Sequence, residues 1–171
     1  SVLGTRATRR CQPRNGMCMG ERRSPGGAPR VLVVDDDPRI VRLLVFTLER
    51  AGYQVRAFRC GRTALELLPH LRPDIVIVDA LLSGLDGPTI CRQIRAAGLR
   101  ETAVLLLTTW VDEAMVRRCL EAGADMVVHK PFSPLGLLET LTALRRRRSG
   151  VTASKAQEDA PGSAGLVEPA G

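Results

Sequence analysis

The chain has 171 residues, 44% of them hydrophobic, which is enough for one folded domain with tails. No apolar run approaches the roughly 20 residues of a membrane span, and the basic N-terminus lacks the apolar segment of a secretory signal. The five cysteines are spaced neither as a disulfide framework nor as CxxC metal ligands, so we expect no membrane association and a reducing, cytoplasmic location.

The formal net charge of +7 belongs mainly to the two ends of the chain. Residues 1–30 carry seven arginines and one glutamate, whereas residues 31–144 carry thirteen basic and fourteen acidic groups, a net charge of −1. The central part is therefore nearly neutral, and we do not expect it to bind nucleic acid. Only two of the 25 basic residues are lysines, which singles out Lys130 in the central part.

The first stretch, residues 1–29, contains Gly, Pro, Ser and Arg without an apolar period. We expect a disordered basic tail there. Residues 147–171 turn into Ser, Gly, Ala, Pro and Glu and predict a second disordered tail. Residues 30–146 between them form the predicted folded domain.

Five short strands, of which the second is alternating rather than apolar in character, are separated and followed by five helices along the folded part. The predicted strands cover residues 30–34, 53–58, 74–78, 103–107 and 125–129. The predicted helices cover residues 38–51, 61–71, 88–98, 112–122 and 133–144. Asp37 and Pro38 supply an N-cap and a first-turn proline, and residues 79–87 read as a surface turn. This alternation predicts an α/β fold, in which helices cover both faces of a parallel sheet.

Polar side chains stand at the ends of four predicted strands, and these residues are Asp35, Asp36, Asp79, Thr108 and Lys130. The carboxyl ends of parallel strands lie at one edge of a sheet, so we expect the five side chains to meet. Clustered carboxylates repel each other, and burial raises their pKa values. A bound Mg²⁺ would relieve the repulsion between these charges. With Lys130 as a charge clamp, Thr108 as a donor and Asp79 as a nucleophile, the set predicts a phosphoryl-transfer site.

The order of several short motifs extends this pattern over residues 30–145. The motifs are Val33-Val34-Asp35-Asp36-Asp37-Pro38, Val78-Asp79, Asp86-Gly87, Leu107-Thr108, Ala122-Gly123-Ala124-Asp125 and Lys130-Pro131-Phe132. In this order and spacing they resemble the receiver domain of two-component response regulators. The resemblance implies a flavodoxin-like, doubly wound, five-stranded parallel sheet in the order 2-1-3-4-5, with five helices.

The resemblance also implies roles for the site residues. Asp79 would take a phosphoryl group from a partner histidine kinase or phosphotransfer protein, and Thr108 and Lys130 would bind that group and report its presence. The implied ligands of Mg²⁺ are the carboxylates of Asp35, Asp36 and Asp79 and the backbone carbonyl of Leu81. Such a protein is a phosphoacceptor that assists its own phosphorylation and dephosphorylation, rather than an enzyme.

Some positions depart from the usual receiver pattern. The loop reads Leu81-Leu82-Ser83 where a Met-Pro pair is common, and Thr109 follows Thr108 where a small residue is usual. Val127 replaces the usual switch aromatic, for which Trp110 is the candidate substitute. The resemblance implies that Leu81 and Trp110 flank the approach of water to the phosphorylated aspartate, and neither side chain hydrogen-bonds an attacking water well. The sequence therefore predicts a long-lived phosphorylated state.

The 23 residues after Arg148 are too few for a helix-turn-helix domain. The sequence therefore predicts a single-domain regulator, similar to chemotaxis regulators, unless the chain is a piece of a longer protein. It would signal by docking to an output partner, and the fourth helix with the fifth strand would be the face of a homodimer.

Two alternative functions stay open at this point. The first is a receiver-like interaction module that never becomes phosphorylated. The second is a Mg²⁺-dependent phosphatase of the haloacid-dehalogenase type, for which Asp35 and Asp37 would be the nucleophile and the acid. Against the phosphatase, the chain has no cap domain, and Asp79 and Lys130 fall in the receiver order.

Overall fold

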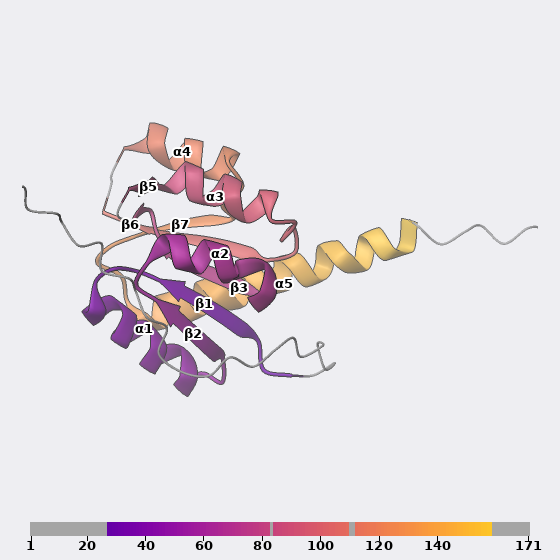
Figure 1. Cartoon of the computed structure of the whole chain (residues 1–171). Helices are drawn as coiled ribbons and strands as arrows, with labels where there is room; N and C mark the ends of the chain where they lie inside the picture. The colour runs from indigo at the N-terminus through magenta and orange to yellow at the C-terminus, as the bar shows by residue number, and fades with distance from the viewer. Residues whose placement is uncertain (1–26, 83, 110–111, 159–171) are drawn as a thin grey trace, which may run out of the picture.

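The computed structural model describes residues 27–82, 84–109 and 112–158, and its centre is a five-stranded sheet (Figure 1). The strands are β1 (Arg30–Val34), β2 (Gln54–Phe58), β3 (Ile75–Asp79), β6 (Ala103–Thr108) and β7 (Met126–His129). Every neighbouring pair is parallel, and the order is β2-β1-β3-β6-β7. This is the predicted order 2-1-3-4-5 once the short β4 and β5 are left out of the numbering, so the flavodoxin-like fold is confirmed.

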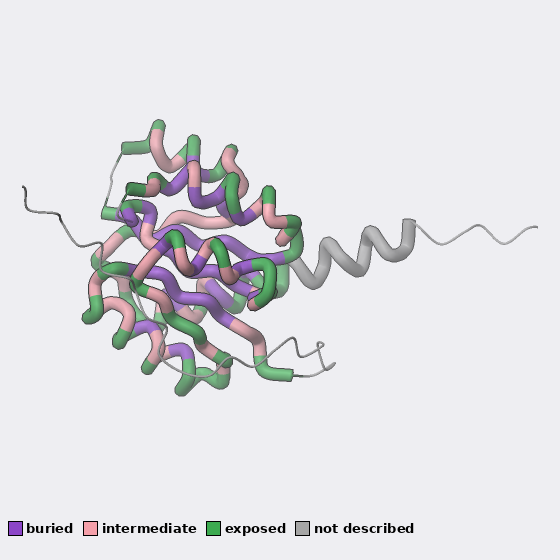
Figure 2. Tube along the Cα trace, viewed as in Figure 1, coloured by how far each residue is buried: buried purple, intermediate pink, exposed green. Residues whose placement is uncertain are grey.

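Helices cover both faces of the sheet and bury alternate strand residues. Helices α1 (Pro38–Arg50) and α5 (Pro134–Glu158) pack on one face, against a core that includes Val33, Ile77 and Leu105. Helices α2 (Gly61–Leu71), α3 (Gly87–Ala96) and α4 (Glu113–Glu121) pack on the other, against a core that includes Val76 and Leu106. Figure 2 shows the three central strands as the most continuously buried part of the chain. Because both faces are covered, these strands are apolar throughout, as the sequence predicts.

The loop after β3 differs from the predicted turn, because it contains a small antiparallel hairpin. Strand β4 (Leu81–Leu82) pairs with β5 (Leu85–Asp86). Leu82 is buried, and a Cβ added at Gly61 would lie 2.8 Å from its Cδ1 atom. The glycine at the start of α2 therefore leaves room for the hairpin, which keeps the residues after Asp79 close to the body of the domain.

The last helix is longer than the sequence pattern indicates. Helix α5 continues to Glu158, whereas the prediction ends it at residue 144 and places a disordered tail from residue 147. The buried residues described on α5 are Leu137, Leu141 and Leu144, and the apolar period of the sequence ends with them, whereas the helix itself continues. The following residues include Arg, Ala, Lys, Gln and Glu, which are good helix formers. Among the described residues, none of the helices has the length and apolar character needed to cross a membrane.

A half-buried arginine ties α3 to two loops at the amino ends of the strands. The guanidinium of Arg95 donates hydrogen bonds of 2.7–3.0 Å to the backbone carbonyls of Leu99, Thr102 and Gly123. It also forms an ion pair of 2.9 Å with Asp125. Gly123 has a φ of +108°, and a Cβ there would lie 2.8 Å from Cγ of Arg95, so this contact depends on the glycine.

Replacing Arg95 with alanine should lower the free energy of unfolding by about 2–4 kcal/mol, because several partly buried acceptors lose their donor. Arg92→Ala is the matched control, since Arg92 is an exposed residue of the same helix that bonds the side chain of Thr89. Its change should stay within about 0.5 kcal/mol. Denaturant unfolding followed by circular dichroism measures both, and equal losses would contradict this role of Arg95.

Candidate functional site

The parallel sheet brings the predicted site residues to one edge. Asp35 directly follows β1, Asp79 ends β3 and Thr108 ends β6. Lys130 follows β7, and its backbone N–H donates a hydrogen bond of 2.7 Å to the carbonyl of Thr108. Lys130 and Asp35 are 95 positions apart in the chain, yet their side chains are in contact. The meeting is therefore a consequence of the sheet order and not of local sequence.

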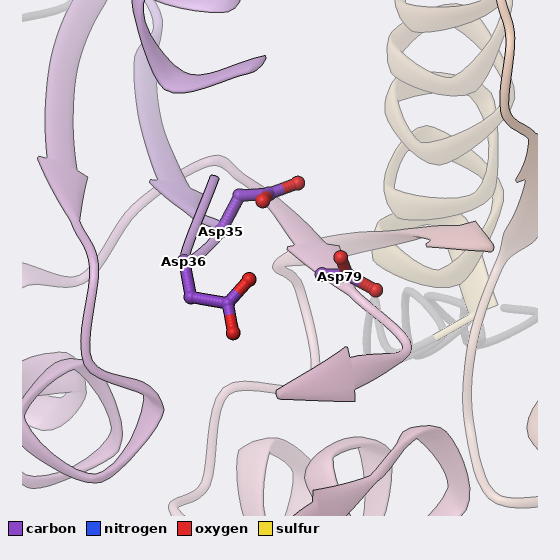
Figure 3. A group of neighbouring side chains, drawn as sticks. All are labelled: Asp35, Asp36 and Asp79. Carbon is purple, nitrogen blue, oxygen red and sulfur yellow. The ribbon is translucent and has the colours of Figure 1, made fainter. Parts of the chain in front are cut away.

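Three carboxylates form a compact group at this edge (Figure 3). One oxygen from each of Asp35, Asp36 and Asp79 lies within 4.8 Å of the other two. Asp35 is fully buried, Asp79 is mostly buried and Asp36 is exposed. The group is thus anchored in the core on one side and open to solvent on the other.

The side chain of Lys130 bridges two of these carboxylates. Its Nζ donates a hydrogen bond of 2.7 Å to Oδ2 of Asp35 and one of 2.6 Å to Oδ2 of Asp79. The remaining oxygen of each acid accepts from a backbone N–H two residues later: Asp37 at 2.9 Å for Asp35, and Leu81 at 2.8 Å for Asp79. Both carboxylates are therefore held at both oxygens, with one cation shared between them.

The charges at the site are balanced against burial. Burial raises the pKa of Asp35 above its ordinary value, although the hydrogen bonds from Lys130 and Asp37 act in the opposite direction. Burial also disfavours the charged form of Lys130, but the hydrogen bonds and charges of Asp35 and Asp79 outweigh it and raise the pKa of the lysine. Lys130 is therefore a permanent cation within the acid cluster at neutral pH.

Other predicted residues lie around this centre. Thr108 is buried at the end of β6, and Thr109 after it is exposed. Leu81, in β4, lies two residues after Asp79 and is 58% exposed although its side chain is apolar. Val127, in the place of the usual switch aromatic, is half-buried against the core beneath α4. Trp110, the candidate substitute for that ring and the second water barrier, lies outside the described residues.

The donor set of the cluster fits Mg²⁺. This ion takes hard oxygen ligands at short distance, is bound by few carboxylates and keeps several waters. Three carboxylate oxygens that lie within 4.8 Å of one another, in a group that is open to solvent at Asp36, match that preference. Asp37, although it is adjacent in sequence, does not join the group, because it caps α1 by accepting from the N–H of Arg39 at 2.8 Å.

The sequence patterns missed one residue at this edge, Arg59. It directly follows β2, and its guanidinium donates two hydrogen bonds, of 3.3 and 3.4 Å, to the backbone carbonyl of Asp36. The one available signal in the sequence was its position. Arg59 follows the carboxyl end of a strand, and the carboxyl ends of all five parallel strands lie together.

Comparisons with known proteins agree with this geometry. The family model described as the response regulator receiver domain matches residues 31–142. The chain is 38% identical over 118 residues to the DNA-binding response regulator MtrA of Mycolicibacterium smegmatis. It is 39% identical over 118 residues to the alkaline phosphatase synthesis transcriptional regulatory protein PhoP of Bacillus subtilis. Each match covers 69% of this chain, but 51% of MtrA and 49% of PhoP, so the chain spans about half the length of these relatives.

Solved structures show the same likeness over nearly their whole length. The chemotaxis response regulator CheY4 of Vibrio cholerae is 31% identical with a TM-score of 0.65, over 68% of this chain and 98% of that chain. The BeF3-activated receiver domain of DrrB is 34% identical with a TM-score of 0.63, over 70% of this chain and 98% of that chain. The family match includes the three clustered aspartates and the bridging lysine. The chain therefore belongs to the response regulators of two-component systems, and residues 31–142 are its receiver domain.

Proposed function

We propose that the domain accepts a phosphoryl group on Asp79 from a histidine kinase or phosphotransfer protein, in a reaction that requires Mg²⁺. The carboxylates of Asp35, Asp36 and Asp79 hold the metal, while Thr108 and Lys130 bind the phosphoryl group. The phosphorylated domain then signals by docking to an output partner.

The observation that supports this proposal best is the position of Lys130 between two acids. Its ammonium group lies 2.6 Å from Asp79 Oδ2, so an anionic group attached to Asp79 would form within reach of a fixed positive charge. A lysine ammonium is a compact point charge that can neutralise phosphoryl oxygens as they approach. An acid that only capped a turn would need no such partner.

The chemistry follows from these contacts. A carboxylate oxygen of Asp79 attacks the phosphorus, so a P–O bond forms while the bond to the donor nitrogen breaks and its electron pair stays on the nitrogen. The N–H of Leu81 holds one Asp79 oxygen, and Lys130 moves its hydrogen bonds and charge to the incoming phosphoryl oxygens. The hydroxyl of Thr108 donates a further hydrogen bond. When bound, Mg²⁺ neutralises charge on the phosphoryl oxygens, and we propose the backbone carbonyl of Leu81 as its remaining protein ligand.

Helix α1 offers a docking surface for the phosphodonor beside the site. The helix begins at Pro38, two residues after Asp36, and its outer side exposes Leu43 and Phe46. The guanidinium of Arg50 lies 5.5 Å from the centre of the Phe46 ring. A partner helix with apolar and acidic residues would match this surface. We propose that a homodimer would form through the face of α4 and β7, where Leu120 is 45% exposed and β7 is an edge strand of the sheet.

The phosphatase alternative conflicts with the environment of Asp37. That residue would have to donate a proton, but the hydrogen bond from the Arg39 side chain lowers its pKa to about 2. An acid that is ionised at neutral pH has no proton to give. The interaction-module alternative predicts no binding of beryllofluoride in the presence of Mg²⁺, whereas a competent phosphoryl site should bind it only when Mg²⁺ is present.

Asp79→Asn should abolish labelling by acetyl phosphate, because the amide cannot act as the nucleophile, and should leave the fold intact. Intact-protein mass spectrometry measures the added phosphoryl group. The matched control is Asp86→Asn, since Asp86 caps α3 outside the cluster and asparagine is an equally good N-cap. Equal labelling of Asp79→Asn and wild type would disprove the assignment of the phosphorylated residue.

Asp35→Asn should stabilise the metal-free domain and weaken its response to Mg²⁺. Because the pKa of Asp35 is raised above 3.8, the folded state binds more protons than the unfolded state, and stability falls as the pH rises through the raised value. A neutral amide removes this loss at pH 7. Free Mg²⁺ at a hundred times its Kd should stabilise the wild type by about 2.7 kcal/mol and this variant by far less. Thermal unfolding in EDTA and in Mg²⁺ measures both effects, and an unchanged Mg²⁺ response would exclude Asp35 as a ligand.

Leu81→Asn should hydrolyse the aspartyl-phosphate about three- to ten-fold faster, because the amide can hydrogen-bond the attacking water and leucine cannot. Phosphate release is measured after removal of the donor at fixed Mg²⁺. Leu120→Asn, at a similarly exposed leucine on α4, is the control and should release phosphate at the wild-type rate. If both variants match wild type, Leu81 is not a barrier to water.

A further inference from the structure

We infer that Arg59 is a positioning residue, which holds the main chain of Asp36 so that its carboxylate meets those of Asp35 and Asp79. This inference rests on the proposed role of the three carboxylates as ligands of Mg²⁺. Asp36 is the exposed member of the group and lies in the bend between β1 and α1. A ligand on such a segment binds a metal well only where its backbone is fixed.

The sheet register places Arg59 beside this bend. The N–H of Asp35 donates a hydrogen bond of 3.2 Å to the carbonyl of Phe58, which extends the β1–β2 ladder by one step. Continued by one step, the register that pairs Val34 with Phe58 places Arg59 opposite Asp35 and therefore next to the following residue, Asp36. Nε and Nη2 of Arg59 both point to one acceptor, the carbonyl oxygen of Asp36, at 3.4 and 3.3 Å. In the described part of the chain, Arg59 makes no other hydrogen bond or ion pair.

Two effects of the guanidinium on metal binding have opposite signs. Its positive charge, close to the acid cluster, repels a divalent cation and weakens binding. Its paired hydrogen bonds restrict the bend and strengthen binding, since less conformational freedom is lost when the metal binds. Because Arg59 contacts the main chain of Asp36 and is exposed, water screens its charge, and we expect the second effect to dominate.

The choice of arginine supports a positioning role. A planar guanidinium can direct two N–H groups at one oxygen, whereas a lysine presents a flexible point charge. If the residue served only to set the charge of the edge, either side chain would suffice. A lysine variant therefore separates the two effects, because it retains the charge and loses the paired geometry.

The test is the affinity for MgCl₂ alone, measured by titration calorimetry on the full chain. We expect Arg59→Ala and Arg59→Lys each to bind Mg²⁺ about five-fold more weakly than wild type. The control is Arg62→Ala, which removes an exposed arginine from the first turn of α2 that makes no hydrogen bond or ion pair within the described residues, and it should bind at least as tightly as wild type. Tighter binding by Arg59→Ala, or wild-type binding by Arg59→Lys, would overturn the inference.

A double-mutant cycle shows whether Arg59 acts through Asp36. With Asp36→Asn as background, Arg59→Ala should cause little further loss of affinity, because the ligand that it positions is already gone. A full five-fold loss in that background would overturn the positioning role. If the wild type itself binds no Mg²⁺, the proposed metal site fails together with this inference, whereas equal affinities of wild type and both Arg59 variants would remove the inference alone.

Discussion

The site depends on one interaction, the bridge from Lys130 to Asp35 and Asp79. Three carboxylates with oxygens within 4.8 Å of one another repel, and the buried member is the least able to bear a charge. The lysine reduces both the repulsion and the cost of the buried charge, because its single ammonium group binds Asp35 at 2.7 Å and Asp79 at 2.6 Å. The carboxylates can thus lie close together and still be open to solvent at Asp36, as the proposed binding of a cation and a phosphoryl group requires.

The bridge is possible only because the sheet is parallel and ordered β2-β1-β3-β6-β7. This order sets β1 beside β3, so that Asp35 and Asp79 are neighbours, and carries Lys130 to the same edge after β7. All five strands contribute a residue to that edge, and in β1, β3 and β6 this residue follows a buried apolar run. The core and the site therefore depend on the same packing. Burial of the sheet on both faces positions the strands, and the strand ends position the charged side chains.

The sequence is sufficient to predict the strands, the helix order and the convergence of the acids, because buried parallel strands are continuous apolar runs and their ends share one edge. It is not sufficient where packing or length decides. The strands β4 and β5 of the hairpin are too short to show a period in the sequence, and the room that Gly61 leaves for Leu82 is visible only in the packing. The end of α5 cannot be predicted from the apolar period, because this period stops at Leu144 while the helix continues to Glu158. Arg59 has no motif, since its contact is with a backbone carbonyl.

The arginine and lysine side chains of this chain make different kinds of contact. Of its 25 basic residues 23 are arginines, yet the residue between the two site acids is a lysine. A guanidinium needs several acceptors in its own plane, and Arg95 has them in three carbonyls and one carboxylate. Between Asp35 and Asp79, where one oxygen of each acid is already held by a backbone N–H, only a compact ammonium can bond both remaining oxygens from one atom. In the proposed phosphoryl transfer, the same compactness would let Lys130 move its hydrogen bonds to the phosphoryl oxygens without reorienting a planar group, so a lysine suits a contact that has to change, while the arginines suit contacts that do not.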